Sequence, residues 1–430
     1  MRPISTICAA ILIMTFLAPV VSAQLATEGF ATIFNGTDLD GWDGDTRFWS
    51  VKDGIIRGET TEDNPTEGNT FLVWRGGDPK DFILRIKFRL RNGNSGVQYR
   101  SKEMSQWRIT GYQAEVENNP GKVGFLYHEA GRGWLVNVGD FMVIEEDNQQ
   151  SVVGKVSDVE QLKYWNYYND QDWNEYIIIC QGNYIRHYLN GYPTMALIDN
   201  DRVLDSANPE DRKGAPRDGV IALQIHQGPP MLVEFKDIYV RNLDSNYGKA
   251  VRIFNGESLD GWVPMNENSA DTFGVANGVM TNTGKPAGYI RTVADYTNFA
   301  LHVQMKHVEA GNSGVLVRRT GDDKVWPKSI EAQGQSGSMG DIWNIDKVKM
   351  NVAQDRTNGR HTRRMYDPNE ASIGYWNDYE VWLDGGDLEI RVNNLAQNTA
   401  TDVEEVAGSI CLQAEGSAKE FRNIVLVPID

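Results

Sequence analysis

The chain has 430 residues, of which 42 are Lys or Arg and 59 are Asp or Glu, giving a net charge of −17. This acidic balance argues against nucleic acid or an anionic membrane as the main partner and favours a neutral ligand. With 40% hydrophobic residues and 42 glycines, the length is sufficient for two ordinary cores.

The chain opens with a segment that predicts export. Residues 1–23 combine one positive charge, Arg2, with an apolar run and the small-residue ending Val21-Ser22-Ala23. These features are typical of a secretory signal peptide, and we expect cleavage near Ala23 and a periplasmic or secreted mature chain. No later segment is apolar over a length that predicts a membrane span.

Beyond this segment the chain repeats itself. The phrase "IFNGTDLDGW" at Ile33 returns as "IFNGESLDGW" at Ile253, and "GNSGV" occurs in both halves. The repeat predicts a first domain over residues 24–242, a linker over 243–250 and a second domain over 251–430. The first copy carries extra residues between shared motifs, and these are candidate functional loops.

Both halves show the pattern of β structure. Short runs of alternating polarity, rich in Val, Ile, Tyr and Phe, are separated by Asn-Gly, Asp-Gly and Gly-Gly turns. The pattern predicts an all-β protein of two tandem sandwiches, because paired sheets protect such strands from exposed edges. Features written twice are expected to be scaffold, including Trp42 and Trp262 as core aromatics. Cys180 and Cys411, one in each half, are predicted to be buried thiols.

Several motifs together carry a family resemblance. "FNGTDLDGW", "GNSGVQYRS", "GYQAEV", "FLYHEAGRGWL" and "LQIHQGPPMLVEFKDI" follow one another in this order. They resemble the 3-keto-disaccharide hydrolase domain family, in two tandem copies that cover nearly the whole mature chain. The resemblance implies concanavalin A-like jelly-roll sandwiches, a saccharide or glycoside as the substrate, and a sugar site on the concave face.

The "GYQAEVE" segment is a candidate lining of this groove. In a strand, alternate residues point to opposite faces, so Gln113, Glu115 and Glu117 share one face. Gln113 and Glu115 match the family motif and are expected in the groove, whereas Glu117 is expected to face solvent.

The "LYHEAGRGW" segment is a second candidate, because a Gly-rich loop with His, acid, Arg and Trp side chains is poor core material. It is predicted to form part of the site, with an exposed loop of ordinary ion pairs as the alternative. Its candidate residues are Tyr127, His128, Glu129, Arg132 and Trp134.

His226, in "LQIHQGPP", occupies the place of Ala414 or Glu415 in the second copy. A histidine between apolar strand residues is often structural, and the family match makes a catalytic role an equal alternative. Trp107, Trp134 and Trp165 have no echo in the second half and are candidate platforms for sugar rings.

The resemblance implies cleavage of a 3-keto sugar by proton abstraction at C2, elimination of the C1 substituent and hydration. His226 and His128 could transfer protons, Glu115 and Glu129 could act as bases, and Arg100 could join Arg132 in stabilising charge. The oxygens of Gln113, Glu115 and Glu129 also suit a divalent cation, Ca²⁺, Mg²⁺ or Mn²⁺. No nucleotide cofactor is expected, since neither half has a Gly-rich turn between a strand and a helix.

Two other functions remain open. A conventional glycoside hydrolase would use two carboxylates, such as Glu115 and Glu117, on an unoxidised substrate. A tandem lectin-like protein would bind saccharides without turnover. The second domain is predicted to be a binding or divergent copy, and its candidate site residues are Arg318, Glu331, Gln333, Asp341 and Glu415.

Overall fold

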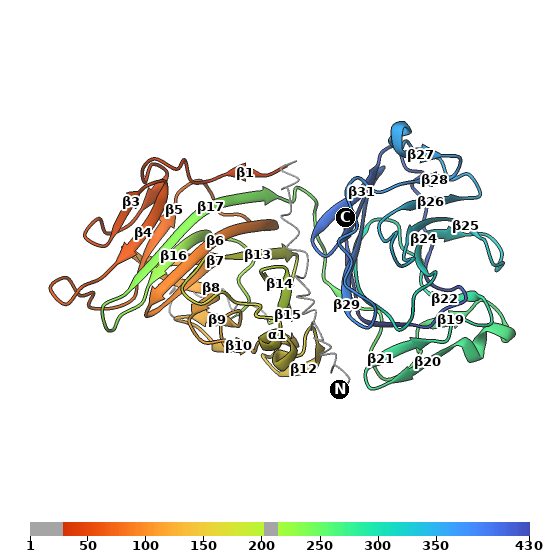
Figure 1. Ribbon diagram of the computed structural model, residues 1–430, viewed down its shortest axis with the longest axis horizontal. Helices are drawn as coiled ribbons and strands as arrows, with labels where there is room; N and C mark the ends of the chain where they lie inside the picture. The colour runs from red at the N-terminus through yellow and green to blue at the C-terminus, as the bar shows by residue number, and fades with distance from the viewer. Residues whose placement is uncertain (1–28, 202–213) are drawn as a thin grey trace, which may run out of the picture.

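The computed structural model describes residues 29–201 and 214–430, so the expected signal peptide lies outside the described residues. Each half forms a sandwich of two β-sheets, and the two sandwiches lie side by side (Figure 1). The prediction of two tandem jelly-roll sandwiches is confirmed. Among the described residues, no helix combines the length and apolar character needed to cross a membrane.

In each domain we call the sheet that faces the other domain the inner sheet and the remaining one the outer sheet. The first inner sheet contains, in spatial order, β12 (Gln150–Lys155), β11 (Asp140–Ile144), β15 (Tyr192–Asp199), β14 (Tyr184–Leu189), β13 (Asn174–Gln181), β6 (Phe82–Asn92), β17 (Leu232–Asn242), β4 (Ile55–Glu59) and β3 (Trp49–Lys52), with β1 (Ala31–Thr32) paired to β17. The first outer sheet contains β10 (Gly133–Val136), β9 (Leu126–Glu129), β8 (Arg108–Glu117), β7 (Asn94–Ser105), β16 (Val220–Ile225), β5 (Thr70–Trp74) and β2 (Trp42–Asp43).

The second domain follows the same plan. Its inner sheet contains β20 (Phe273–Ala276), β21 (Val279–Asn282), β33 (Lys419–Pro428), β23 (Phe299–His307), β29 (Trp376–Asp384), β30 (Asp387–Val392) and β31 (Leu395–Ala400), with β18 (Val251–Arg252) paired to β33. Its outer sheet contains β19 (Trp262–Pro264), β22 (Gly288–Thr292), β32 (Ser409–Ala414), β24 (Gly314–Thr320), β25 (Lys328–Gln333), β26 (Ile342–Ile345), β28 (His361–Thr362) and β27 (Thr357–Asn358).

Among the residues that the structure describes, helices are confined to short segments between strands. They are the α-helix α1 (Val159–Tyr164) and the 3₁₀ helices η2 (Glu267–Thr272) and η3 (Gln354–Arg356).

Each sandwich has its own core, and a third apolar layer joins the two inner sheets. This layer includes Ile179 and Ile198 from the first domain and Trp382 and Val427 from the second. Because the inner sheets pack on each other, the outer sheets face opposite ends of the molecule. Any site on one outer sheet is therefore separate from a site on the other.

Buried polar side chains also contact one another across the same interface. Arg186 of β14 lies 3.0 Å from Glu380 of β29, and both side chains are buried. His302 lies between the Tyr184 hydroxyl, at 2.9 Å, and Asp378, at 2.7 Å. Removing one partner of a buried ion pair is costly, so these contacts hold the domains in one arrangement.

The extra residues of the first copy form β11, β12 and α1, and part of this insertion contacts the second domain. The carbonyl of Val156 accepts hydrogen bonds from Gln304, at 3.1 Å, and Arg422, at 2.8 Å. The segment that follows the β11–β12 hairpin therefore supports the interface between the domains.

The repeated phrase has the same structural task in both domains. The indole nitrogens of Trp42 and Trp262 donate to the carbonyls of Ile33 and Ile253, at 2.8 and 2.7 Å, and both rings are buried. Their prediction as core aromatics is confirmed. Cys180 and Cys411 are also buried and unpaired, as predicted, and burial raises the pKa of each thiol to about 12.

Candidate functional site

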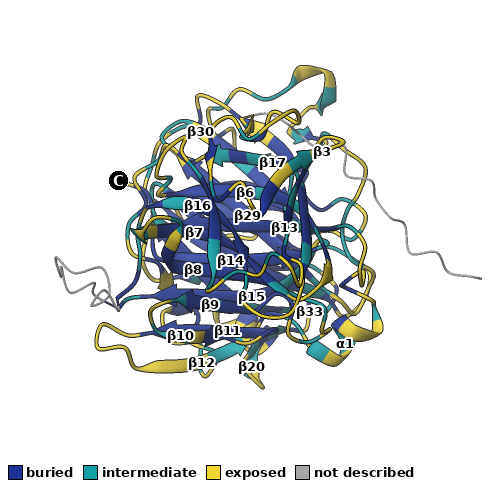
Figure 2. Ribbon diagram, turned by 90° about the vertical axis from the view of Figure 1, so that its left-hand side faces the viewer, coloured by how far each residue is buried: buried dark blue, intermediate teal, exposed yellow. Residues whose placement is uncertain are grey.

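Strand β8 places the predicted pair of polar residues on the outward face of the first outer sheet. Tyr112, Ala114 and Val116 point into the core, so Gln113 and Glu115 point out of the sandwich. Even so, these two side chains are only 2% and 5% exposed. Figure 2 looks onto this side of the molecule, where the strands from β16 to β10 are largely buried and the surrounding loops are exposed.

Amide groups surround the carboxylate of Glu115. One of its oxygens accepts from Asn94, and the other accepts from Gln113 at 2.8 Å. Gln113 accepts in turn from Gln98 at 2.6 Å. Burial raises the pKa of Glu115 to about 7, because it removes the charged form from water more strongly than the amide hydrogen bonds stabilise it.

Gly96 makes this packing possible. It lies opposite Glu115 in the pairing of β7 with β8, and a Cβ atom there would be 2.3 Å from the Gln113 side chain. Gly314, its counterpart in the second copy, leaves the same space beside Glu331, whose oxygen would be 2.8 Å from a Cβ. The repeated "GNSG" motif therefore gives the polar side chains of both faces room to lie flat on the sheet.

Strand β9 brings a second carboxyl to this face. Tyr127 pairs with Gln113, and Glu129 pairs with Gly111 on β8. Glu129 accepts from Asn69 at 3.0 Å and from Gln224 at 3.4 Å. Burial raises its pKa, and the nearby His226 lowers it.

His226 is partly exposed at the end of β16, with its Nδ1 2.6 Å from the carbonyl oxygen of Gln227. The next residue along the loop, Gln227, is tied through its backbone N–H to Asn69, which also contacts Glu129. His226, Glu129 and Glu115 thus belong to one polar face, as the sequence suggested.

An aromatic platform and an apolar wall border the polar groups. Trp134 of β10 pairs with Tyr127, is 46% exposed and stacks on Phe125 with ring centres 3.7 Å apart. At the other side, a small apolar cluster lies on the same outward face. It consists of Phe71, Val73, Ile109 and Ala222.

His128 and Arg132 lie on the opposite side of the sheet, inside the sandwich. Arg132 forms a buried ion pair with Asp199, and its Nε donates to His128 Nδ1 at 3.1 Å. Burial lowers the pKa of His128 to about 3, so this imidazole is neutral. The cause is strand alternation: Tyr127 and Glu129 point outward, and therefore His128 between them points inward.

Arg100 and Arg318 are scaffold residues rather than ligands for a substrate. Both have left-handed backbones, with φ of 47° and 48°, and both are buried. The Arg100 guanidinium pairs with Asp81 at 2.9 Å and donates to two backbone carbonyls. Arg318 likewise donates to backbone carbonyls, including that of Glu404 at 2.8 Å. The expectation that these arginines reach the groove is not met by their positions.

The pairing register relates the two outer sheets residue by residue. Gln98 pairs with Gln113 in the first domain, and Leu316 pairs with Glu331 in the second. Two positions further on, Glu115 corresponds to Gln333, so the acid and the amide have exchanged places. Leu223 and Leu412 pair with the equivalent Val97 and Val315. Counting on from these leucines, Glu415 takes the position of His226.

The outward face of the second outer sheet holds two carboxyl groups with fewer hydrogen-bond donors around them. Glu331 is 4% exposed, and its Oε1 has no hydrogen-bond partner. Burial, reinforced by the charge of Glu415, raises the pKa of Glu331 to about 8. Glu415 accepts from Asn312 at 2.7 Å, and burial raises its pKa as well.

Sequence analysis missed an aromatic and histidine pair beside Glu331. Trp343 pairs with Glu331 across β25 and β26, and the His361 ring stacks on the Trp343 ring with centres 4.5 Å apart. His361 Nε2 lies 2.7 Å from Asp341, so this predicted site acid contacts His361 and holds the imidazole in place. Trp343 follows Asp341 by two residues, which was the available signal; His361 comes from a separate strand, β28.

The predicted divalent cation does not fit these residues. Within residues 29–201 and 214–430, no three His, Cys, Asp or Glu side chains come together in a way that could hold a metal. In the first domain, the oxygens of Glu115 and Glu129 accept hydrogens from amide groups. These amide donors compete with a cation for the carboxylate oxygens.

The remaining tryptophan candidates lie elsewhere. Trp107 donates its indole N–H to Asp43 at 3.0 Å. Trp165 stacks on Tyr192 and meets Tyr375 of the second domain, with ring centres 4.9 Å apart in the latter pair. Of the three candidates, only Trp134 lies beside the polar residues of the outward face, where it pairs with Tyr127.

Comparison with known proteins identifies related domains. The family model for the 3-keto-alpha-glucoside-1,2-lyase-like domain matches residues 29–241 and again residues 249–427. A search of curated proteins gave no match.

Similar solved structures include a putative glycosyl hydrolase from Parabacteroides distasonis, at 22% identity over 42% of this chain and 94% of that one, with a TM-score of 0.33. They also include a carbohydrate-binding module from Bacillus subtilis, at 12% identity over 38% and 93% of the two chains, with a TM-score of 0.30. A Bacillus licheniformis beta-glucanase shares 16% identity over 43% and 97% of the two chains, with a TM-score of 0.32.

Proposed function

The chain belongs to the 3-keto-alpha-glucoside-1,2-lyase-like domain family of carbohydrate-active proteins, and from this premise we propose that its first domain cleaves 3-keto-glycosides. The reaction is proton abstraction beside the ketone, elimination of the C1 substituent and hydration. One observation carries the proposal: a buried carboxyl, Glu115, has its pKa raised to about 7 on the outward face of the first outer sheet. A general base works best with a pKa near the working pH.

The chemistry follows from the ketone. A carbonyl at C3 acidifies the hydrogen on C2, so a base can remove it and leave an enolate on the C3 oxygen. When the carbonyl re-forms, the electron pair makes the C1–C2 double bond and the C1–O bond breaks, with a proton going to the departing oxygen. Water then adds its oxygen to C1 and a proton to C2, which yields the free 3-keto sugar.

The residues on the outward face divide these tasks. Ionised Glu115 accepts the C2 proton, with Asn94 and Gln113 holding its two oxygens in place. We assign proton donation to the departing oxygen to Glu129, whose pKa is raised by burial and which lies near the partly exposed His226.

Neutral donors face the enolate, because the predicted cations Arg100 and Arg132 are engaged in buried ion pairs elsewhere. The Tyr127 hydroxyl, on the strand next to Gln113, is the donor we assign to the C3 oxygen. Trp134 supplies a flat apolar surface for a sugar ring beside it.

The second domain is proposed to bind saccharide without this cleavage. The observation that favours binding is the replacement of His226 by Glu415, together with a Glu331 that keeps its proton at neutral pH. A protonated carboxyl donates hydrogen bonds to sugar hydroxyls but cannot abstract the C2 proton. Export to the periplasm or medium, as the first residues suggest, completes the proposal.

The test compares matched glucosides with and without a keto group at C3. Wild type, Glu115→Gln and Glu331→Gln are assayed for release of the C1 substituent. We expect turnover of the keto substrate alone, lost in Glu115→Gln and retained in Glu331→Gln. Equal cleavage of the unoxidised glucoside would instead favour a conventional glycoside hydrolase. Binding of both without cleavage would leave a lectin-like protein.

A further inference from the structure

We propose that the first domain has a second saccharide-binding site, built around Trp74 at the open end of its sandwich and separate from the outward face. The site is a pocket of about 360 Å³, within the range of small-molecule sites. Its lining comes from β1, β5 and β17, from the segment after β1 and from the turn before β2. The lining residues are Ala31, Thr32, Ile33, Asn35, Asp40, Gly41, Trp74, Val240 and Asn242.

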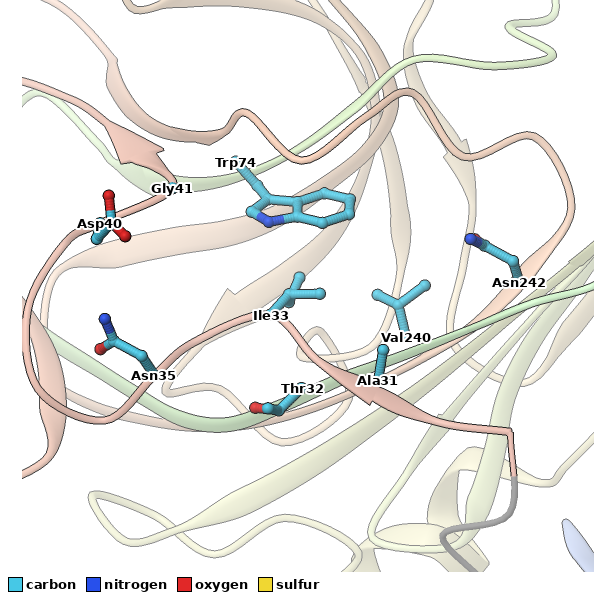
Figure 3. A pocket seen from close by; sticks show the side chains of 9 residues that line it. All are labelled: Ala31, Thr32, Ile33, Asn35, Asp40, Gly41, Trp74, Val240 and Asn242. Carbon is cyan, nitrogen blue, oxygen red and sulfur yellow. The ribbon is translucent and has the colours of Figure 1, made fainter.

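The arrangement of these side chains suits a sugar ring. In Figure 3 the Trp74 indole lies across the pocket, with Ile33 and Val240 on the side facing it. Asp40 and Asn35 lie toward one end of the indole, and Asn242 lies toward the other. An apolar slot with polar groups at both ends matches a pyranose, which has C–H groups on its faces and hydroxyls around its rim.

Several polar groups of the pocket are uncommitted. Among the residues that the structure describes, no hydrogen bond engages the Trp74 indole nitrogen, the Asp40 carboxylate or the Asn242 side-chain amide. Gly76 supports the indole from its edge, where a Cβ atom would be 2.2 Å from the ring. The indole is thus held in place by the backbone while its N–H and the nearby acceptors remain available to hydroxyl groups.

The second domain shows that the fold itself does not require these residues. Trp42 pairs with Trp74, and the equivalent Trp262 pairs with Thr292, a buried residue whose hydroxyl donates to the carbonyl of Ala294 at 2.7 Å. In the same way, the pairings of β1 and β18 place Pro428 at the position of Asn242. The same sandwich closes with threonine and proline there, so tryptophan and asparagine are features of the first copy alone.

The site continues beyond one sugar. A second pocket of about 430 Å³ shares Trp74 and Asn242 and extends past Gly76 toward Asp81 and Ser245. Together the two pockets form a groove on which Trp74 is central. The ligand class is therefore a neutral oligosaccharide of more than one unit, recognised without any need for a keto group.

The groove is distinct from the proposed reaction site. On β5, Phe71 and Val73 point to the outward face, whereas Leu72 points into the core, and Trp74 packs against that core. A glycan held at Trp74 would therefore leave the outward face open. Such a site would retain the protein on a polymeric glycan while shorter substrates are processed.

The experiment measures binding of unoxidised cellohexaose, maltohexaose and xylohexaose to the mature chain by isothermal titration calorimetry. Every protein carries Glu115→Gln, so the result is independent of turnover and of the proposed function. We expect one of the three to bind and Trp74→Ala to weaken that binding by roughly tenfold or more. Trp326→Ala is the matched control, since Trp326 is 40% exposed and lies on the second domain.

Asp40→Ala and Asn242→Ala keep the test valid if Trp74→Ala fails to fold, because both side chains are exposed. Each of these two substitutions is expected to weaken binding severalfold. Release of the C1 substituent from a small 3-keto-glucoside should be unchanged when Trp74→Ala is made in the wild-type background. The proposal is overturned if none of the three hexasaccharides binds. It is equally overturned if binding is the same in the Glu115→Gln parent and in all three pocket variants made from it.

Discussion

The two outer sheets share a backbone register and differ in where they place acid. In the first domain, Glu115 is held by two amide donors, and its pKa is raised to about 7. In the second, Glu331 has an oxygen without a donor and a second carboxyl nearby, and its pKa is raised to about 8. The comparison teaches that moving the acid two residues along the strand, in exchange with its amide neighbour, takes away its hydrogen-bond donors and raises its pKa further.

The largest expected effect is a loss of turnover when Glu115, the acid of the first outer sheet, is replaced. Glu115→Gln removes the base but keeps the size of the side chain, and turnover of a 3-keto-glucoside should fall by about 100-fold or more. Steady-state kinetics measure the loss. Glu117→Gln is the matched control on the same strand face. The Glu117 carboxyl is partly exposed, and it forms an ion pair with Lys122 at 3.8 Å. A similar loss in Glu117→Gln would point to a pair of carboxylates and contradict the assignment.

The pH profile sharpens the same comparison. Glu115 must be ionised to accept a proton and Glu129 must be protonated to donate one, so kcat/KM should rise with pH toward the Glu115 pKa of about 7 and fall once Glu129 loses its proton. Below that value each unit of pH should cost about tenfold in rate. Measurement between pH 5 and pH 9 in constant ionic strength tests this. A profile that is flat through neutrality would remove Glu115 from the base role.

A smaller effect is expected on protein stability when Glu331, the acid of the second outer sheet, is replaced. Between the ordinary carboxyl pKa of 4.5 and the raised value of about 8, folded Glu331 keeps a proton that the unfolded chain releases. The unfolded state therefore binds fewer protons, and the free energy of unfolding falls as pH rises through this window. Glu331→Gln should raise Tm at pH 8.5 and leave it nearly unchanged at pH 4. An identical shift at both pH values would contradict a buried, protonated Glu331.

The smallest expected effect is that of a chelator. Since the carboxylate oxygens of the first face accept amide hydrogens, incubation with EDTA should change turnover by less than about twofold. Metal analysis of the purified protein before and after treatment provides the control. Loss of activity that returns on adding Ca²⁺, Mg²⁺ or Mn²⁺ would show that the amides rearrange to admit a cation.

Sequence reasoning succeeded where the pattern was local or repeated. Alternation along one strand was enough to place Gln113 and Glu115 together, and the duplication marked Trp42 and Trp262 as scaffold. The same alternation, applied to "LYHEA", would have separated His128 from its neighbours Tyr127 and Glu129. Treating that segment as a loop, when it forms β9, was the source of the error.

Other features depend on contacts between distant segments, which a sequence pattern does not contain. Arg100 looked like an available cation because its partners, Asp81 before β6 and the carbonyl of Gly182 in the turn after β13, come from distant segments. His361 reaches Trp343 only through the pairing of β26 with β28. The Trp74 pocket likewise needs β1, β5 and β17 to meet.

The most direct measurement of the central claim follows hydrogen at C2. Cleavage of a 3-keto-glucoside is run in D₂O, and the released sugar is examined by NMR at early times, beside a control in which the free 3-keto sugar is incubated with the protein. Elimination followed by hydration places one solvent deuterium at C2 of the product, and Glu115→Gln should abolish its formation. A released sugar that keeps its original C2 hydrogen would show direct hydrolysis at C1 and contradict the account.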